Sequence, residues 1–315
     1  MNRHTSFITS SLITDSFVTT HFWRHVCRKT LFSATLFITA SSLFSPIAHA
    51  QSTPNSTGII SAGAAITEII NALGAKQQLI AVDVTSKTLV ANDVPKVGYH
   101  RQLSAESLIA LAPTRIIGSD EMGPPKTLAL LKQSGIEVDI VNGGETVNDL
   151  LHRIDQVAAL TQHQQQAQQL KQQITTTVEN IKQRNLHQKQ PKKVLFLMIH
   201  DGRPISVAGK NTTADSIITL AGAINPAASM VANYKPISTE AILQMQPDII
   251  LLSDRTTASI KDMAQLVKKM PMLAATPAAK NNAIAVIDGT ALIGGLGIHS
   301  INEAMRLNRV FYPQS

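Results

Sequence analysis

Cysteine and aromatic residues are scarce in this sequence, and most of them lie near its start. Among 315 residues there are one Cys, one Trp, three Tyr and eight Phe. Cys27, Trp23 and six of the eight Phe fall within residues 1–50. The chain beyond residue 50 has no thiol, which excludes disulfides and thiol catalysis there and suits an oxidising compartment. A tyrosine within a motif stands out, because so few aromatic rings remain.

The first fifty residues follow the pattern of an export signal. A basic flank ending at Lys29 precedes a mostly apolar, uncharged run over 30–45, and Ala-His-Ala at 48–50 is a small-x-small cleavage pattern. The run is shorter than the ~20 residues of a membrane-spanning helix, and no stop-transfer pattern follows it. Cys27 precedes the run, on the wrong side for a lipid-modified cysteine. We therefore expect residues 1–50 to be a cleaved signal peptide.

The chain beyond residue 50 shows neither a strong charge excess nor a catalytic motif. Of the 28 Lys/Arg and 21 Asp/Glu, four bases and one acid lie within residues 1–50, which leaves 24 and 20 and a net charge of about +4. No Lys/Arg block marks a nucleic-acid surface. The motifs G-x-S-x-G and H-E-x-x-H are absent, and GGLG at 294–297 is interpreted as a loop. The remaining histidines lack the paired spacing of a zinc site.

Two pairs of similar segments predict two similar lobes. LSAESLIALAPTRIIGSDE (103–121) and ISTEAILQMQPDIILLSDR (237–255) both contain Ser-x-Glu, an apolar helix, a proline and a short apolar strand ending in Ser-Asp. A weaker similarity joins residues 60–75 to residues 206–223. Repeated βα units indicate an α/β fold of two lobes with parallel-rich sheets. Ligands bind beyond the carboxyl ends of such strands, so we expect a cleft between the lobes.

A helical pattern separates the two copies. Apolar residues recur at steps of three and four from Val147 to Ile181, with no Gly or Pro between 146 and 186. We predict one long helix over 146–186, roughly 60 Å long at ~1.5 Å per residue. The predicted domains are an N-terminal lobe at 51–145, the connecting helix segment at 146–191 and a C-terminal lobe at 192–315. Strands are expected at 58–61, 78–83, 115–118, 137–141, 194–199, 205–208, 248–253 and 283–287, and further helices at 104–112, 213–221, 239–246, 257–269 and 298–310.

These features resemble a known family. The export signal, the paired Ser-x-Glu units and the connecting helix are similar to the cluster of periplasmic substrate-binding proteins that serve iron-complex and cobalamin ABC importers. Within that cluster, GYHRQLSAE at 98–106 and YKPISTEAIL at 234–243 resemble the haem-binding branch, the haemin-uptake binding proteins of Gram-negative bacteria. The likeness covers residues 56–312. It implies a periplasmic protein that carries haem and catalyses no reaction.

The resemblance implies that Tyr99 is the axial ligand of ferric haem. A phenolate is a hard anionic ligand that suits Fe(III), and a nearby cation stabilises it. Arg101, two residues further on, is expected to supply that charge. His100 alternates with Tyr99 and is expected at the surface or beside the ligand rather than on the iron.

Other residues are weaker candidates for the haem site. His200 ends the apolar run VLFLMIH and is either a structural histidine or a second axial ligand, to the same haem or to a second one. His299, before the last predicted helix, is a further candidate for haem contact. In the second lobe, Tyr234 and Lys235 occupy the position that matches the tyrosine motif. Lys235 is either a partner of a haem propionate or a solvated loop lysine.

Glu106 and Glu240 recur at equivalent points of the two copies. Each lies two residues after a predicted N-cap serine, Ser104 or Ser238, where the helix dipole favours a carboxylate by ~0.3–1 kcal/mol. The resemblance implies a second role, because family members place these glutamates against arginines of the two permease subunits.

The sequence therefore predicts a monomeric periplasmic protein that captures one or two ferric haems and delivers them to an ABC permease dimer. The nearest alternative is the same fold carrying a ferric siderophore or cobalamin. Such sites usually use several aromatic or basic residues, and few aromatic residues remain here. A metal-ion-binding protein needs convergent His, Asp or Glu ligands, whereas the histidines here are scattered. A secreted α/β enzyme needs a nucleophile–base pair or a glycine-rich cofactor loop, and the sequence shows neither.

Overall fold

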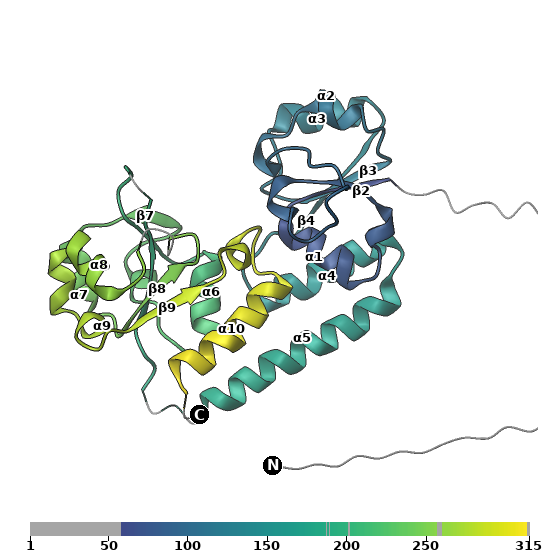
Figure 1. The fold of residues 1–315 in the computed structure, drawn as a ribbon. Helices are drawn as coiled ribbons and strands as arrows, with labels where there is room; N and C mark the ends of the chain where they lie inside the picture. Colours follow the sequence, from purple (N-terminus) through teal and green to yellow (C-terminus); the bar gives the residue numbers. More distant parts are fainter. Residues whose placement is uncertain (1–57, 187, 189, 201, 257–259, 314–315) are drawn as a thin grey trace, which may run out of the picture. The chain divides into compact units, whose positions relative to one another are not determined.

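The structure, a computed structural model, describes residues 58–186, 188, 190–200, 202–256 and 260–313 (Figure 1). The predicted signal peptide lies outside these residues. The first half holds a parallel sheet of order β2-β1-β3-β4. Its strands are β1 (Ile59–Ala62), β2 (Leu79–Val82), β3 (Arg115–Ser119) and β4 (Glu137–Val141). Its helices are α1 (Ala64–Ala72), α2 (Ala105–Ile109) and α3 (Pro125–Gln133), with short 3₁₀ turns that include η2 (Val84–Ser86) and η3 (His100–Gln102).

The second half holds a mixed sheet of order β7-β6-β5-β8-β9. Strands β5, β8 and β9 run parallel, whereas β6 pairs antiparallel with both β5 and β7. The strands are β5 (Val194–Met198), β6 (Ser206–Ala208), β7 (Tyr234–Pro236), β8 (Ile249–Ser253) and β9 (Ile284–Ile287). The helices are α6 (Thr213–Leu220), α7 (Thr239–Met245), α8 (Met263–Lys269), α9 (Pro277–Lys280) and α10 (Ile298–Phe311). The prediction of two α/β lobes is thereby confirmed, and β7, α3 and α9 are elements that the sequence pattern did not reveal.

The prediction of one long connecting helix is wrong. The segment forms two helices, α4 (Val147–Thr161) and α5 (Gln164–Asn185), which pack against each other. Helix α4 begins with a capping box between Thr146 and Asp149. It ends at Gln162, which takes a left-handed conformation with φ 62° and so turns the chain. Because this turn uses neither Gly nor Pro, the helical periodicity on either side concealed it.

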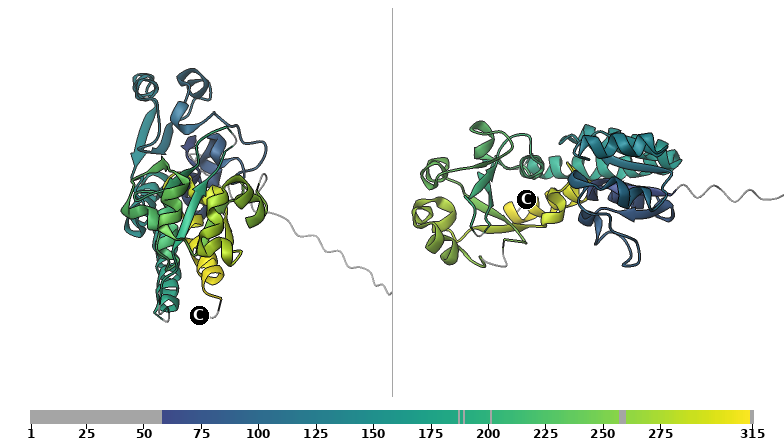
Figure 2. Two further views of the ribbon diagram at one scale, coloured as in Figure 1. Left: turned by 90° about the vertical axis from the view of Figure 1, so that its left-hand side faces the viewer. Right: turned by 90° about the horizontal axis from the view of Figure 1, so that it is seen from above.

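One hydrophobic core joins the two halves. It runs from both sheets through the helices between them and includes Ile59, Ile117, Val157, Ile174, Phe196, Leu251 and Phe311. Helix α10 packs on α1 of the first half and lies beside α5, as Figures 1 and 2 show. Burial of apolar surface is the main stabilising contribution in folding, so this shared core links the halves firmly. Within the described ranges, no helix has the length and apolar character that a membrane span requires.

Candidate functional site

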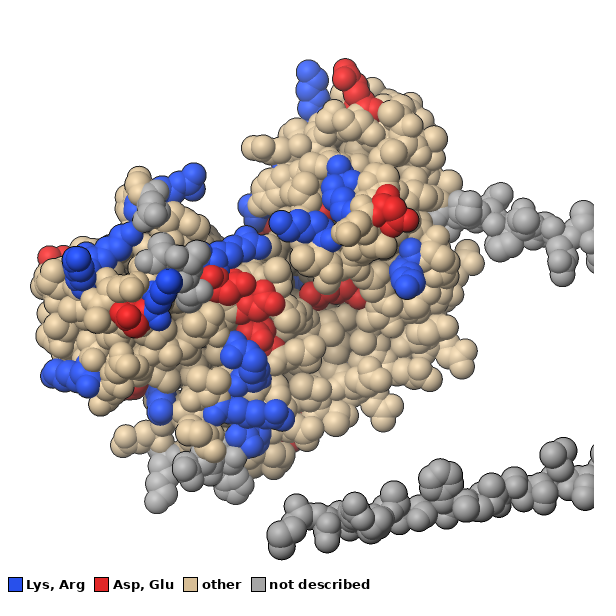
Figure 3. All heavy atoms as spheres, viewed as in Figure 1, with Lys and Arg blue, Asp and Glu red and all other residues tan. Residues whose placement is uncertain are grey.

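A cavity of about 360 Å³ is lined by both halves of the protein. The first half contributes Tyr99, His100, Arg101, Glu121 and Glu145, and the second half contributes Asn211, Thr212, Thr213, Asn233, Tyr234 and residues 292–295. The molecular face in Figure 3 is hollowed, and side chains of both charge signs gather around the hollow. The tyrosines of both motifs that the sequence singled out, Tyr99 and Tyr234, therefore line the same cavity.

Tyr99 stands at the wall of this cavity with 41% of its surface exposed. It directly precedes η3 in an extended conformation. The backbone N–H of Val84 donates to the carbonyl of Gly98 at 2.8 Å and thereby fixes the segment beside the end of β2. Gly98 has a φ of +92°, which an L side chain rarely adopts. This local geometry leaves the phenol accessible to a ligand.

His100 is buried beside Tyr99, which excludes the surface position and leaves the expected alternative of a place next to the proposed ligand. Only 1% of its surface is exposed. Its Nδ1 lies 2.9 Å from Oδ2 of Asp83, and its Nε2 lies 3.5 Å from Oε2 of Glu121. Burial by itself lowers the pKa of His100, but Asp83 and Glu121 outweigh it and hold the pKa above its ordinary value. The imidazole therefore carries a proton more readily than a free histidine.

Arg101 is exposed and forms an ion pair with Glu121. The approach of His100, followed by the charge of Arg101, holds the pKa of Glu121 below its ordinary value despite partial burial. The predicted charge partner of Tyr99 thus lines the same cavity, but its guanidinium is paired with a carboxylate that the sequence analysis did not single out. Glu121 lies two residues after the carboxyl end of β3, a position where cleft residues of α/β proteins are expected.

Tyr234 reaches the cavity from the second half. It lies on β7, and its ring meets Phe196 edge to face at 6.3 Å. Burial, and then the carboxyl of Glu145, raise the pKa of Tyr234 to about 12, so its hydroxyl stays protonated. Lys235 is the next residue on the strand and points to the opposite face. It is exposed and does not line the cavity.

Glu145 is a cavity residue that the sequence analysis missed. Its Oε1 accepts a hydrogen bond of 3.1 Å from the hydroxyl of Thr213 in the other half, while its Oε2 is buried without a partner. Burial raises the pKa of Glu145 to about 7. The available signal was its position shortly after the carboxyl end of β4. Its hydrogen bond to α6 connects the two sides of the cavity.

Arg153 links the two segments that carry cavity residues Glu145 and Gly295. It lies on α4 with none of its surface exposed. Its Nη2 donates to the carbonyl of Gly144 at 2.8 Å, and its Nη1 donates to the carbonyl of Leu296 in the second half at 3.1 Å. A side chain at Gly295 would come within 2.6 Å of the Gly143 carbonyl. The glycines of the 294–297 loop therefore allow the two halves to approach closely.

The structure does not bring the other two predicted histidines to this cavity. His200 follows β5 and is exposed, and it is not among the residues that line the cavity. His299 pairs through Nε2 with Oδ2 of Asp288 at 2.8 Å. Its backbone N–H donates to Glu68, and it faces a different hollow, of about 570 Å³. A role for His299 in contact with the cavity ligand therefore has no support in the geometry.

Glu106 and Glu240 are exposed in the first turns of α2 and α7. The predicted caps are confirmed: the hydroxyl of Ser104 accepts from the backbone N–H of Ser107, and that of Ser238 accepts from Ala241. Neither glutamate lines the cavity, so both are available to a partner protein.

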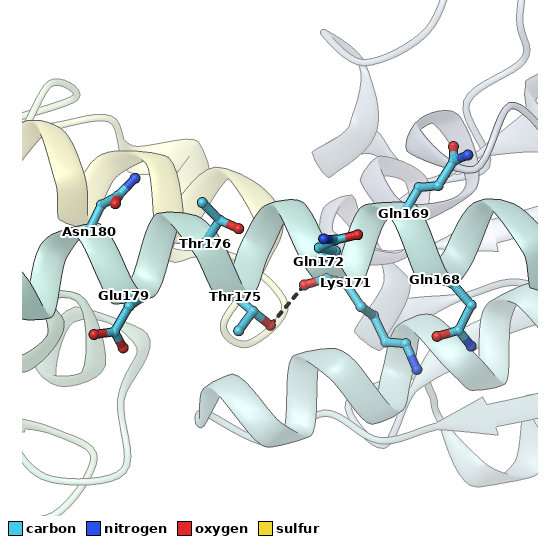
Figure 4. Close-up of a pocket in the computed structure, with 8 residues that line it drawn as sticks. All are labelled: Gln168, Gln169, Lys171, Gln172, Thr175, Thr176, Glu179 and Asn180. Carbon is cyan, nitrogen blue, oxygen red and sulfur yellow. Dashed lines mark hydrogen bonds between the residues drawn. The ribbon is translucent and has the colours of Figure 1, made fainter.

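A larger hollow, of about 690 Å³, runs along α5 (Figure 4). Its lining consists of polar residues of that one helix: Gln168, Gln169, Lys171, Gln172, Thr175, Thr176, Glu179 and Asn180. The opposite side of α5 carries the buried apolar residues. The hollow is the solvated face of an amphipathic helix, and side chains do not converge on it from several elements as they do around Tyr99.

Residues 59–291 match the family described as periplasmic binding protein. The chain belongs to this family. The periplasmic haem-binding protein HutB of Vibrio cholerae is 48% identical, with a TM-score of 0.77 over 82% of this chain and 100% of that one. A periplasmic haem-binding protein of Pseudomonas aeruginosa is 32% identical, with a TM-score of 0.75 over 82% and 94%. A vitamin B12-binding protein of Vibrio parahaemolyticus is 26% identical over 68% of this chain and 77% of that protein.

Membership of this family makes the protein a substrate-binding component of transport and not an enzyme. The similarity to haem-binding members that the motif at 98–106 predicted is confirmed. Among the described residues there is no group of three or more His, Cys, Asp or Glu that could hold a metal ion.

Proposed function

We propose that the protein binds ferric haem in the periplasm and delivers it to an ABC permease, with Tyr99 as the axial ligand. The observation that carries this proposal is the placement of Tyr99. The only tyrosine of the first half is exposed at a cavity shared by both halves. A phenolate ligand favours ferric iron.

The charged residues around Tyr99 have distinct roles in this proposal. The cations nearest the phenolate are Arg101 and protonated His100, and the carboxylates of Glu121 and Asp83 balance their charge. Tyr234 keeps its hydroxyl proton and is a hydrogen-bond donor to a ligand from the opposite wall. Lys235, exposed on β7 next to Tyr234, is the proposed partner of a propionate at the protein surface. His200, exposed after β5, is the proposed second axial ligand or the ligand of a second haem.

Cobalamin is the second candidate, because vitamin B12-binding proteins are also relatives of this chain. Two observations favour haem. The 48% identity to HutB extends over that whole chain, whereas the identity to the B12-binding protein is 26% over 77% of that protein. The cavity also presents a phenol, an anionic ligand that suits ferric iron better than the occupied coordination sphere of cobalamin.

Titration with ferric haem, followed by visible spectroscopy, tests the proposal. We expect the wild-type protein to give a high-spin ferric spectrum of the tyrosinate type and Tyr99→Ala to lose most of its affinity. Tyr312→Phe is a matched control, since Tyr312 packs at the end of α10 and bonds to Gly222, away from the cavity. A wild-type protein that leaves the haem spectrum unchanged while it binds cobalamin would refute the haem assignment.

The same titration measures the role of His200. If His200 holds a second haem, His200→Ala should halve the stoichiometry, and if it is the second ligand of one haem, the spectrum should change at unchanged stoichiometry. A variant that matches wild type in both respects would remove His200 from the site.

A further inference from the structure

His100 has an environment that packing alone does not require. Its neighbours in sequence, Tyr99 and Arg101, are exposed, yet its imidazole is buried in the first half of the protein. An ionisable pair in a protein interior loses hydration that its mutual attraction only partly restores, and apolar residues of similar size often replace such pairs without loss of stability. The pair of His100 with Asp83 therefore calls for a reason beyond stability.

Asp83 holds the imidazole in one orientation. The carboxylate is completely buried at the end of β2, and its Oδ2 lies 2.9 Å from Nδ1 of His100. Its Oδ1 accepts hydrogen bonds from the hydroxyls of Thr85 and Ser86 at 2.8 and 2.9 Å. Because a carboxylate can only accept, the proton of the pair lies on Nδ1 of the imidazole.

Further hydrogen bonds anchor Asp83 to the sheet. The hydroxyl of Ser86 also lies 2.8 Å from that of Thr67 on α1, which in turn lies 2.8 Å from that of Ser61 on β1. The backbone N–H of Asp83 donates to the carbonyl of Ser61. Several hydrogen bonds thus fix the carboxylate, and its hydrogen bond to Nδ1 restrains the orientation of His100.

The fixed imidazole supports the Tyr99 ring. The two ring centroids lie 4.5 Å apart with the planes at 60°, and the phenol lines the cavity with 41% of the residue exposed. On the far side of the imidazole, Nε2 lies 3.5 Å from Glu121, which pairs with Arg101. Asp83 therefore restrains the imidazole through Nδ1, Glu121 lies within ion-pair distance of Nε2, and Tyr99 rests against the restrained ring.

We propose that the buried Asp83–His100 pair is a positioning device that sets the orientation of the Tyr99 ring for ligation of iron. This inference rests on the proposed binding of ferric haem. Groups that orient a metal ligand through hydrogen bonds commonly alter metal affinity by ~10–100-fold when they are removed. His100 itself does not bind the iron, because its surface is buried.

Two substitutions at His100 separate its contributions in the full-length protein. His100→Phe keeps an aromatic ring against Tyr99 but loses the hydrogen bond to Asp83, whereas His100→Gln keeps a donor and loses the ring. We expect His100→Phe to raise the Kd for ferric haem about tenfold and to change the electron paramagnetic resonance signal of the bound high-spin iron. His100→Gln should show a smaller change. His152→Phe on the exposed surface of α4 is the matched control and should behave as wild type.

The outcomes distinguish this inference from the proposed function. Chemical denaturation measures the stability of each variant apart from the signal of the bound iron. Should His100→Phe fail to fold, Asp83→Asn tests the same hydrogen bond. Its iron signal is expected to lie outside the range of the wild type and the control variant. If the folded His100 or Asp83 variant binds haem with wild-type affinity and gives an unchanged iron signal, the inference is overturned. The proposed function still stands in that case, provided that Tyr99→Ala abolishes binding. Unchanged binding in Tyr99→Ala would instead refute the proposed ligand itself.

Discussion

Glu145 shows how a single buried carboxyl makes the cavity sensitive to pH. Burial raises its pKa from 4.5 to about 7, so between these values the folded protein keeps a proton that the unfolded chain has released. The free energy of unfolding therefore contains a contribution that is complete below about pH 4.5 and is lost as the pH rises through 7. Its Oε2 is buried without a partner, so the ionised form is the one that the cavity disfavours.

Glu145→Gln removes this dependence. Between pH 5 and pH 8 the wild type should lose ~2 kcal/mol in its free energy of unfolding that the variant keeps. This is less than the full pKa shift of Glu145 corresponds to, because part of the side chain is solvated. Urea unfolding at a series of pH values measures the difference. The matched control is Glu179→Gln on the exposed face of α5, which should leave the pH profile unchanged. A constant difference between Glu145→Gln and wild type across this range would contradict the prediction.

Other residues show where sequence reasoning at this scale succeeded. The unusual density of polar and aromatic groups at 99–101 correctly indicated the wall of a cavity. The partners of these groups were not predictable, because Asp83 lies seventeen residues from His100 and Glu121 lies twenty from Arg101. A one-dimensional pattern carries no direct information on such pairs.

At the scale of elements, the turn between α4 and α5 is the main departure from expectation. Helical periodicity continues on both sides of it, and the buried residues Leu170, Ile174, Val178 and Ile181 of α5 follow the predicted steps. The break depends on Gln162 in the left-handed conformation, which costs an L residue about 1–2 kcal/mol. The packing of α4 against α5 compensates for this cost, and periodicity alone does not reveal such packing.

Gln162→Gly should therefore stabilise the protein. Glycine adopts the left-handed conformation without strain, but it loses more backbone entropy on folding. We expect a net gain of about 0.5–1 kcal/mol in the free energy of unfolding, measured by urea denaturation. Gln172→Gly on the exposed face of α5 is the matched control and should destabilise by about 1 kcal/mol. A loss of stability at both positions would show that the turn is not strained.

At the scale of the whole molecule, the position of the two exposed glutamates bears on the partner protein. Glu106 and Glu240 belong to different halves, and each is the acidic residue in the first turn of a capped helix. The shared core and the Arg153 contact to Leu296 restrain the halves. The distance between the two carboxylates is thereby also restrained, which suits docking to two positively charged sites at once.

Substitution of these glutamates should impair delivery without affecting capture. We expect Glu106→Ala and Glu240→Ala each to weaken the interaction with the reconstituted permease about tenfold, or ~1.4 kcal/mol, and to leave the Kd for ferric haem unchanged. Glu179→Ala on α5 serves as the control acid. Equal transport rates for all three variants, measured at a concentration below saturation, would argue against docking through these residues.

The sequence by itself determined most of the local structure and the fold class. Apolar runs bounded by polar residues located the main strands, Ser-x-Glu located the starts of α2 and α7, and the repeated βα units indicated two lobes. These features depend on residues close together in the chain, where propensity, capping and periodicity act directly.

Only the tertiary structure decided which residues share the cavity. It brought Tyr99 and Tyr234 together with Glu121 and Glu145, and it left His299 at another hollow. It also buried His100 against Asp83 and turned the chain at Gln162. The physical reason is common to these cases: burial, desolvation and pairing of charges depend on contacts between distant segments, and those contacts exist only after the sheets and helices have packed.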